Sequence, residues 1–368
     1  MEQWEERKEA KTLDETDRKC PQCGGIMSYD AAANGLYCPY CEYREDIVQN
    51  ASDSGSAVEQ DLFGEIPTES YDWGTDTKVV ICEACGAESV YDVLQFSDVC
   101  PYCGSNHVMK ASDDVKTLAP GGVVPFAITR EKAGEKFHNW LKRNWFCPKA
   151  AKESAKAEAL NGLYLPYWTY DCDSDSVYQA YYGRTRTVIR NGKSSTQITW
   201  HPCSGRVQHF HNDVPVCATK RYNLSMLQGL EPFDTENNAA YRPEYIAGYV
   251  AERYSVSLQD GWNLAQPKIL NQVKQIVTQD VQKRFGTSHV RIEKVAPNLS
   301  NVKYKYLMLP IWMSNFQFKG KIYNFMVNGQ TGKVSGKAPV SPFKVVLTVL
   351  LALAALFLIA YASGCIEF

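Results

Sequence analysis

Eight of the thirteen cysteines in this chain fall into two sets of four with identical spacing. Each set has two Cys-x-x-Cys pairs separated by fourteen residues: Cys20, Cys23, Cys38 and Cys41 in the first, and Cys82, Cys85, Cys100 and Cys103 in the second. One such pair presents two thiolates to a metal ion, and two pairs complete a tetrahedral site with no open position. A glycine follows three of the four pairs, and glycine adopts the positive φ of tight turns without steric cost. The spacing therefore predicts two structural zinc ribbons, one a copy of the other.

Cys-x-x-Cys pairs also occur as redox dithiols and in structural disulfides. A redox dithiol is usually solitary and accompanies a βαβ pattern, which this sequence lacks. A disulfide framework would require secretion, whereas residues 1–11 are charged and contain no apolar signal segment. We therefore expect two bound Zn²⁺ ions. Because about forty residues cannot bury a large core, we expect each ribbon to need its metal for folding.

The C-terminal end of the chain is apolar and uncharged over residues 345–362. A helix of that length approaches the roughly 30 Å thickness of a bilayer core. The sequence thus predicts a transmembrane helix over residues 343–363, with a buried core helix as the alternative. Lysines precede this segment and only residues 364–368 follow it. The positive-inside rule then predicts a tail-anchored, single-pass protein of the cell membrane, with a cytoplasmic body and the C-terminus outside.

Charge is mixed over the whole chain, with 39 basic and 41 acidic residues and a net charge of −2. This balance argues against a dedicated nucleic-acid-binding protein, because phosphate contacts usually require a basic excess. Residues 45–77 contain nine acidic residues and no Lys or Arg, which predicts a solvated linker between the ribbons. Its apolar groups at residues 62–63 and 71–73 would either bind a partner or pack against a ribbon.

A second duplication is visible after the ribbons. The sequence Val-Pro-Phe at 124–126 precedes a helical pattern that ends at residues 163–168 (LYLPYW), and Glu-Pro-Phe at 231–233 precedes helical patterns that end at residues 308–312 (MLPIW). Alternating aromatic and polar residues follow each copy and predict strands. Asn-Gly pairs at 191 and 328 predict hairpin turns. We therefore expect two copies of one helix-then-hairpin unit.

Two helices are predicted within this body. Thr129 can cap a helix that ends near Pro148. Asp260 can cap a longer helix, and Pro267 favours a start a few residues later. The apolar face of the longer helix consists of Trp262, Ala265, Ile269, Val273, Ile276, Val277 and Val281. This face is most simply part of a core, with a groove for a partner helix as the alternative.

The expected fold class is α+β, with two small four-cysteine zinc ribbons, a duplicated helix-plus-antiparallel-hairpin body and one C-terminal transmembrane helix. The chain divides into a first ribbon (1–44), an acidic linker (45–77), a second ribbon (78–110), two body copies (111–222 and 223–340), the helix (343–363) and an outside tail (364–368).

Signatures of catalysis are absent from the sequence. It contains no phosphate loop, no dinucleotide-binding GxGxxG, no HExxH and no GxSxG, so we do not expect an enzyme. The alternating carboxylates between Asp171 and Asp175 lack the Gly and Glu of a calcium loop, and an exposed strand end is expected there. One further cluster of metal-ligand types consists of His201, Cys203, His209 and His211. Strand alternation would place His209 and His211 on one face, and the cluster would either bind a third metal ion or form a polar hairpin surface.

The order of these features resembles a family of bacterial membrane-anchored zinc-ribbon proteins. The most specific matching segments are residues 163–168, 241–248 (YRPEYIAG) and 328–336 (NGQTGKVSG). Members are labelled TFIIB-type zinc-ribbon-containing or primosomal protein N'-like, and they include YdjG-like proteins. The resemblance implies a role in phage-shock-type membrane stress systems, with flotillin-like and PspA-like partner proteins. It supplies no catalytic residues.

Two functions of different classes follow. The first is a membrane-anchored adaptor or scaffold that recruits membrane proteins and peripheral coat proteins, as a homo- or hetero-oligomer or alone. The second is a membrane-tethered nucleic-acid-binding protein that uses its ribbons. That alternative requires basic ribbons, but residues 20–44 contain only Arg44 and residues 79–109 contain no Lys or Arg. Nucleic acid is therefore the less expected partner. The sequence leaves open the signal that is sensed and any modification of Cys365.

Overall fold

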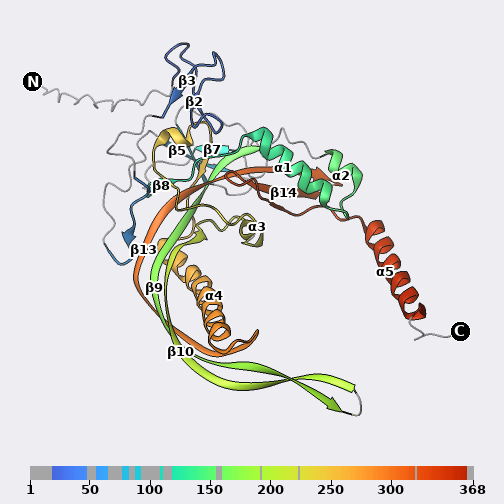
Figure 1. Ribbon diagram of the computed structural model, residues 1–368. Helices are drawn as coiled ribbons and strands as arrows, with labels where there is room; N and C mark the ends of the chain where they lie inside the picture. The colour runs from blue at the N-terminus through green and yellow to red at the C-terminus, as the bar shows by residue number, and fades with distance from the viewer. Residues whose placement is uncertain are drawn as a thin grey trace, which may run out of the picture.

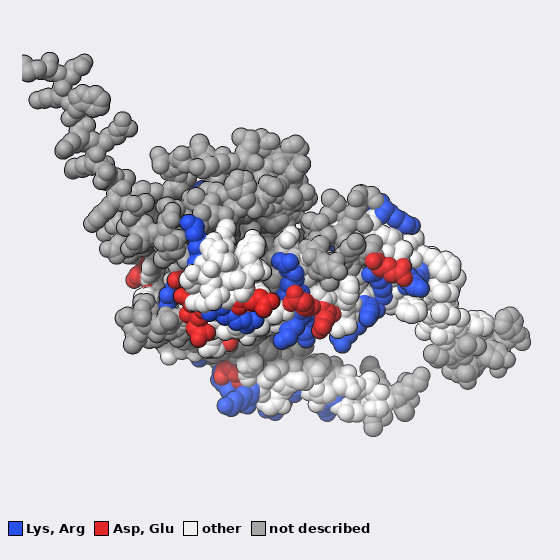
Figure 2. Space-filling view, turned by 90° about the horizontal axis from the view of Figure 1, so that it is seen from above, with Lys and Arg blue, Asp and Glu red and all other residues white. Residues whose placement is uncertain are grey.

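The structure is a computed structural model, and it describes residues 19–47, 55–64, 77–82, 88–92, 108–110, 118–154, 160–190, 193–222, 224–319 and 321–362. More of these residues lie in strands than in helices. One sheet has three strands and the order β1-β2-β3, and a second, mixed sheet contains twelve strands. On the face of the molecule shown in Figure 2, acidic and basic side chains lie interspersed, as the near-neutral net charge suggests.

Three long strands form the centre of the large sheet. They are β9 (Asn161–Arg190), β10 (Lys193–Cys217) and β13 (His289–Phe318). β9 lies between the other two and pairs antiparallel with both. The three strands curve together, and helix α4 (Leu258–Phe285) lies on the concave side of the curve (Figure 1).

The two LPxW segments that the sequence suggested were copies lie opposite each other in this sheet. Pro310 pairs with Tyr164, and Tyr306 pairs with Trp168. Each segment therefore lies inside a long strand, near the start of β9 and toward the end of β13. The indole N–H of Trp168 donates to the carbonyl oxygen of Val256, and that of Trp312 donates to Ile128. Both tryptophans are buried with their polar atom paired, as a buried indole requires.

Shorter elements complete the fold. The strands of the first ribbon are β1 (Ser28–Asp30), β2 (Gly35–Tyr37) and β3 (Arg44–Asp46). The other strands are β4 (Gln60–Asp61), β5 (Thr77–Cys82), β6 (Glu88–Asp92), β7 (Val108–Lys110), β8 (Gly122–Val123), β11 (Ala239–Ala240), β12 (Val250–Glu252), β14 (Lys321–Asn328) and β15 (Val334–Gly336). The remaining helices are α1 (Arg130–Arg143), α2 (Lys149–Ser154), α3 (Leu224–Gln228), the 3₁₀ helix η3 (Pro243–Ile246) and α5 (Pro342–Ala362).

The predicted helices are present, with one shifted start. Thr129 caps α1 by accepting a hydrogen bond from the backbone N–H of Lys132, as expected. Helix α4 begins after Ser257, whose hydroxyl accepts the N–H of Asp260; Asp260 is thus inside the helix that it was predicted to cap. Pro267 also lies within α4. The predicted apolar face of α4 is buried against the sheet, with Ile276 only partly covered.

One of the two predicted hairpin turns is described by the structure, and the other lies outside the described residues. The turn at Asn328 is confirmed: its side-chain oxygen accepts the backbone N–H groups of Gln330 and Thr331, and β14 pairs with β15 beyond it. Residues 191–192 lie outside the described part of the chain, but Arg190 pairs with Lys193 on either side of them.

The expected α+β fold is wrong in its arrangement. The protein is mostly β-sheet with few helices, and strands from both halves of the body pair with each other in one sheet. The sheet is mixed because β8 pairs parallel with β13 and β12 pairs parallel with β9. Local patterns identified strand-forming residues, but pairing between residues more than a hundred positions apart decides which strands are neighbours.

The predicted transmembrane helix is contradicted. The C-terminal residues do form a helix, α5, and its side chains are described as far as Phe357. Among the described residues, no helix is both long enough and apolar enough to cross a membrane; a span needs about 20 such residues. The same finding contradicts two further predictions: the tail anchor, and the single-pass membrane location with a cytoplasmic body. Residues 364–368 lie outside the described part.

The described part of the acidic segment 45–77 is not a free linker. Strand β4 pairs with Lys303 and Tyr304 of β13. Leu62 is buried in the main core, whereas Phe63 is 74% exposed. Within this apolar pair, one residue therefore packs against the body and the other faces solvent. Residues 71–73 are not among those described.

Candidate metal centre and the segments that hold it

The four cysteines of the first ribbon lie together. The Sγ atoms of Cys20 and Cys41 are 3.3 Å apart, those of Cys23 and Cys38 are 3.5 Å apart, and all four lie within 4.8 Å of one another. A tetrahedron with metal–sulfur bonds of about 2.3 Å has sulfur–sulfur edges of about 3.8 Å, so the cluster has the size of a four-thiolate metal site. These distances also exceed the roughly 2.0 Å of a disulfide bond. The cluster can hold a metal ion.

Two equivalent turns position the thiols. In the first, the N–H of Gly24 donates to the carbonyl of Cys20; in the second, the N–H of Glu42 donates to the carbonyl of Cys38. Both turns end in the left-handed region, with φ of 71° at Gly24 and 62° at Glu42. The repeated spacing in the sequence is thus matched by a repeated backbone conformation. Only one of the two turns has the glycine that this conformation favours.

The backbone also favours a charged form of one thiol. Burial acts to raise the pKa of Cys38, but hydrogen bonds from the backbone N–H groups of Cys41 and Tyr40 lower it to about 7. N–H groups aimed at sulfur stabilise a thiolate, which is the form that binds metal. The backbone N–H of Gly25 donates to the sulfur of Cys23, with 3.4 Å between nitrogen and sulfur, and acts to lower the pKa of that thiol, but neighbouring thiols and burial raise it overall.

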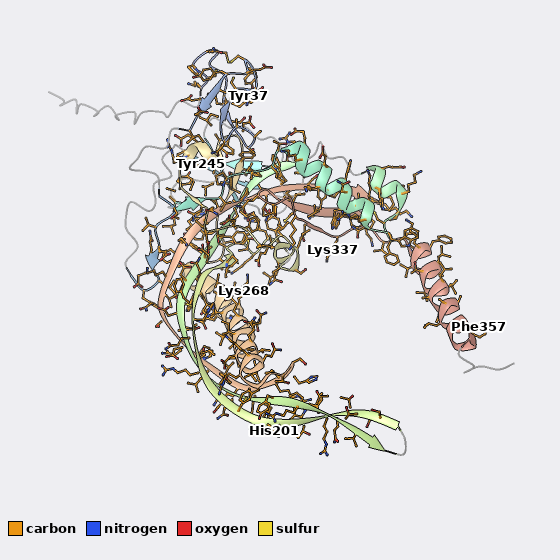
Figure 3. All side chains as sticks on the ribbon, viewed as in Figure 1. Tyr37, His201, Tyr245, Lys268, Lys337 and Phe357 are labelled. Carbon is orange, nitrogen blue, oxygen red and sulfur yellow. The ribbon has the colours of Figure 1, made fainter. Side chains whose placement is uncertain are left out.

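The ribbon is attached to the large sheet through the segment at 245–249. The N–H of Tyr29 donates to the carbonyl of Ala247, and the hydroxyl of Tyr249 donates to the carbonyl of Tyr29. The rings of Tyr29 and Tyr245 meet edge to face at 5.8 Å. Figure 3 shows Tyr245 directly below the ribbon that carries Tyr37. This attachment is formed by part of the YRPEYIAG sequence.

The close approach of this segment depends on a glycine. Gly248 has φ of 81°, and a Cβ there would lie 2.5 Å from the side chain of Ser28. Ala247 is fully buried and shares a small core with Cys20, Met27, Leu36 and Cys38. The metal ligands and the attachment therefore belong to one packed unit, and the geometry of one depends on the other.

The predicted second set of cysteines lies mostly outside the described residues. Cys85, Cys100 and Cys103 are not described, and for Cys82 only its place at the end of β5 is. Strands β5, β6 and β7 pair as a small antiparallel group. β6 also pairs with β12, which joins this region to the large sheet.

The His and Cys residues of β10 do not come together as a metal site. Within the described part of the chain, the four ribbon cysteines are the group of metal-binding residues that the structure brings together. His211 faces α4, where its Nδ1 lies 2.7 Å from Oε1 of Gln272 and its Nε2 lies 2.9 Å from the hydroxyl of Ser174. Burial lowers the pKa of His211. His201 stacks on Tyr182 instead.

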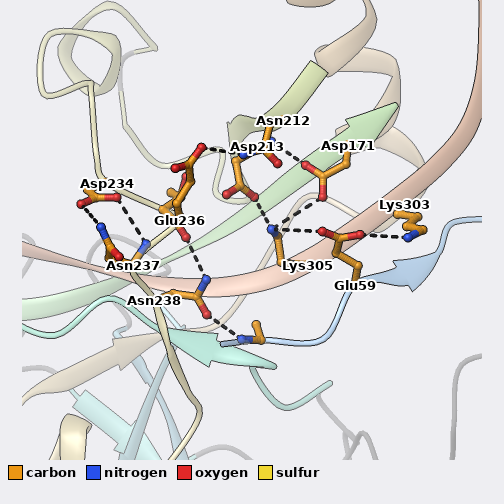
Figure 4. Close-up of polar contacts among 12 residues, drawn as sticks. Glu59, Asp171, Asn212, Asp213, Asp234, Glu236, Asn237, Asn238, Lys303 and Lys305 are labelled. Atoms are coloured by element: carbon orange, nitrogen blue, oxygen red, sulfur yellow. Dashed lines mark hydrogen bonds and ion pairs between the residues drawn. The ribbon is translucent and has the colours of Figure 1, made fainter. Parts of the chain in front are cut away.

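A buried ionic network lies on the other face of β9, and sequence reasoning did not predict it (Figure 4). The ammonium of Lys305 lies 2.6 Å from Asp213 and 3.6 Å from Asp171. The three side chains are 8%, 5% and 1% exposed. Glu59 is 3.9 Å from Lys305 and 3.0 Å from Lys303. The network thus holds the β4 segment against the centre of the sheet.

Two β-bulges frame this network. β10 shifts register between His211 and Val214, and β13 shifts between Ser300 and Lys303. Asp213 has φ of 49°, and its N–H donates to the carboxylate of Asp171. Burial acts against the ammonium, but the hydrogen bond to Asp213 and the surrounding carboxylates raise the pKa of Lys305. The lysine is therefore charged and compensates the buried aspartates.

A comparison with known proteins finds a similar protein in Bacillus subtilis (strain 168), described as uncharacterized protein YdjG. It is 26% identical over 334 residues, which cover 89% of this chain and 91% of that protein. The chain is similar to that protein over most of its length. No family model matches the chain, and no solved structure matches it. The similarity supports the YdjG-like part of the predicted resemblance, and a protein described as uncharacterized offers no function for transfer.

Proposed function

We propose that this protein is a zinc-dependent adaptor, which binds partner proteins through the outer surface of its first ribbon. The observation that carries the proposal is that the ribbon is fixed to the large sheet on one side and exposed on the other. Tyr40, within the second Cys-x-x-Cys pair, is 76% exposed. A metal ion fixes such a turn without a large core, so that its surface remains available.

The metal in this proposal is Zn²⁺, one ion in each ribbon. Four thiolates and no open position suit a structural zinc site, since zinc is bound in tetrahedral four-cysteine sites of this kind. Cys20, Cys23, Cys38 and Cys41 would hold the first ion. Cys82, Cys85, Cys100 and Cys103 would hold the second, because their spacing is identical.

The turn at Glu42 provides a test of the metal site. Glu42→Gly is expected to stabilise the zinc-bound ribbon by about 0.5–1 kcal/mol, because the left-handed backbone conformation costs a non-glycine residue roughly 1 kcal/mol of free energy. Chelator competition would measure this as tighter zinc retention. Gly24→Ala is the matched control at the equivalent position, where a Cβ has open space. It should weaken retention by a similar amount, and a shift of both variants in one direction would contradict the assigned turns.

The proposed partners are proteins of the flotillin-like and PspA-like classes, which the family resemblance suggests. Large exposed aromatic residues are typical anchors of protein interfaces. Tyr40 has this character and is held in place by the metal turn. Its position on a rigid support favours recognition of a partner with little loss of conformational entropy.

Tyr40→Ala therefore tests the adaptor function. We expect the variant to keep its zinc and to bind purified flotillin-like or PspA-like protein from the same organism at least 10-fold more weakly, the loss typical of an anchor residue. Phe63→Ala is the matched control, since Phe63 is equally exposed on a different segment. Nuclease treatment of both samples should leave binding unchanged. Equal binding by Tyr40→Ala and the unchanged chain would refute this surface as the partner site.

A further inference from the structure

The β9–β10 hairpin extends beyond the rest of the large sheet. β13 pairs with β9 only as far as Gly183, which lies opposite His289. Beyond that point the structure describes a two-stranded arm, made of residues 184–190 of β9 and 193–199 of β10. Figure 1 shows this arm leaving the curved strands past the end of α4. An isolated two-stranded hairpin is at best marginally stable in water, so an arm of this length suits a bound partner.

The arm carries charge of a single sign. No Asp or Glu occurs between Asp175 and Asp213, although the chain contains 41 acidic residues. Basic residues within this interval are Arg184, Arg186, Arg190, Lys193 and Arg206. Arg206 pairs with Asp175 in the part of the sheet where β13 is also present, and the other four belong to the arm. The chain therefore contains a local basic segment even though its net charge is near zero.

Strand alternation places two of these residues, Arg184 and Arg186, on one face of the arm. Lys193 pairs with Arg190 in the backbone ladder, so all four basic residues belong to the same paired stretch of the hairpin. Arg184 and Arg186 are exposed, and within the described residues neither pairs with a carboxylate. The guanidinium of Arg184 lies 5.8 Å from the ring centroid of Tyr182, at the base.

The other side chains of the arm that the structure describes are rich in hydroxyl groups. Thr185, Thr187, Ser194, Ser195 and Thr196 are exposed. None of the described residues at 184–188 or 194–200 is an exposed large hydrophobic residue. Protein interfaces depend on buried aromatic or apolar anchors, and membrane surfaces are entered by apolar side chains. Arginine and hydroxyl donors without such anchors are instead typical of contacts to a phosphate backbone.

We propose that this arm binds the phosphate backbone of duplex nucleic acid. A two-stranded antiparallel ribbon is one of the two elements that the major groove of B-DNA admits. The basic face supplies the electrostatic attraction, and guanidinium groups bind phosphate oxygens in pairs. The zinc ribbons, which contain almost no Lys or Arg, take no part. The arm is separate from Tyr40, so this binding is independent of the proposed adaptor surface.

The test is binding of the full-length, zinc-loaded protein to a fluorescein-labelled 30-base-pair DNA duplex across a salt series. Arg184→Ala combined with Arg186→Ala is expected to weaken binding about 10- to 100-fold at 0.1 M salt. It should also reduce the slope of log K against log salt by about 2, since each phosphate contact contributes roughly 0.9. Lys142→Ala with Lys149→Ala removes the same charge from α1 and α2 and should change neither quantity. Arg184→Lys with Arg186→Lys should keep most of the salt slope.

Four results would overturn the proposal. The first is the absence of duplex binding by the unchanged protein at 0.1 M salt. The second is a salt slope that the double alanine variant leaves unchanged. The third is competition by poly-glutamate as effective as that by unlabelled duplex, which would identify an acidic polypeptide as the partner. The fourth is stronger, arginine-dependent binding to phosphatidylserine vesicles than to duplex, which would identify an anionic lipid surface.

Discussion

Replacing both Cys20 and Cys23 by serine is expected to release the metal ion from the first ribbon and to unfold residues 19–47. Structural zinc contributes on the order of 10–16 kcal/mol of apparent binding free energy in small four-ligand units. The core that remains is small, because it consists of Met27 and Leu36 packed against Ala247 together with the cysteines. Such a core cannot offset the conformational entropy of ordering the ribbon.

The large sheet is expected to stay folded in this variant. Its own core contains α1, α4 and the paired long strands, and Tyr29 is the buried ribbon residue that it shares. Bound zinc should fall from two ions per chain to one, and limited proteolysis should cut within residues 19–47 while the sheet remains protected. Cys203→Ser is the control, since Cys203 lies in β10 away from the cluster, and its zinc content should not change. Loss of both ions from the double variant would show that the two ribbons fold as one unit.

Features that depend on neighbouring residues could be predicted from the sequence. The four cysteines of the first ribbon lie together as their spacing required, and Thr129 caps α1 as its position suggested. The buried face of α4 follows the 3.6-residue period. The start of α4 was misplaced because Ser257 and Asp260 are both good capping residues, and only the completed helix shows which side chain accepts the bond.

Features that depend on pairing between distant strands could not be predicted in this way. The residues at 163–168 and 308–312 have the pattern of the ends of two separate units, yet they pair with each other inside the long strands β9 and β13. Alternation identifies a strand and its faces, but it does not identify its neighbour. The single mixed sheet could not be predicted, because the sequence pattern does not show which strands are neighbours.

The buried network around Lys305 is not predicted, although the sequence contains a signal for it. Asp171 follows the segment 164–170, in which four of seven residues are aromatic, and a carboxylate in such a strand is rarely buried unless it is paired. The alternation of the aspartates by itself predicts only the exposed end of a strand. Asp173 and Asp175 do pair at the surface, with Asn301 and Arg206, but Asp171 is buried and needs a cation. The cation comes from a strand more than 130 residues away.

Lys305→Met is expected to destabilise the protein by about 3–5 kcal/mol, the usual cost of leaving a buried charge without its partner. Methionine keeps the length and apolar stem of lysine but removes the ammonium between Asp171 and Asp213. Urea denaturation of the zinc-loaded protein would measure the change in the free energy of unfolding. Restoring neutrality with Asp171→Asn and Asp213→Asn in the same chain should recover much of the loss, because a fully neutral set has no uncompensated charge.

The loss of stability in Lys305→Met should also depend on pH in a defined direction. Burial already raises the pKa of Asp171, against the N–H of Asp213 and the charge of Lys305. Removing that charge raises it further, so the folded variant binds a proton more tightly than the unfolded chain, whose Asp pKa is about 3.9. A carboxyl group whose pKa is raised by folding stabilises the protein at low pH. That contribution is lost as pH rises from the pKa of the unfolded chain through the pKa of the folded protein. The difference between Lys305→Met and the unchanged protein should therefore be smallest near pH 4 and grow toward neutral pH.

Lys303→Met is the matched control, because it makes the same substitution two residues earlier on the same face of β13. The side chain of Lys303 is 51% exposed, and it pairs with Glu59 at the surface. Exposed pairs of this kind contribute about 0–1 kcal/mol. If both variants lose stability equally, burial is not what gives Lys305 its importance. If only Lys305→Met is severe and its loss grows with pH, the charge at the centre of the sheet is what holds β4 and the bulged strands together.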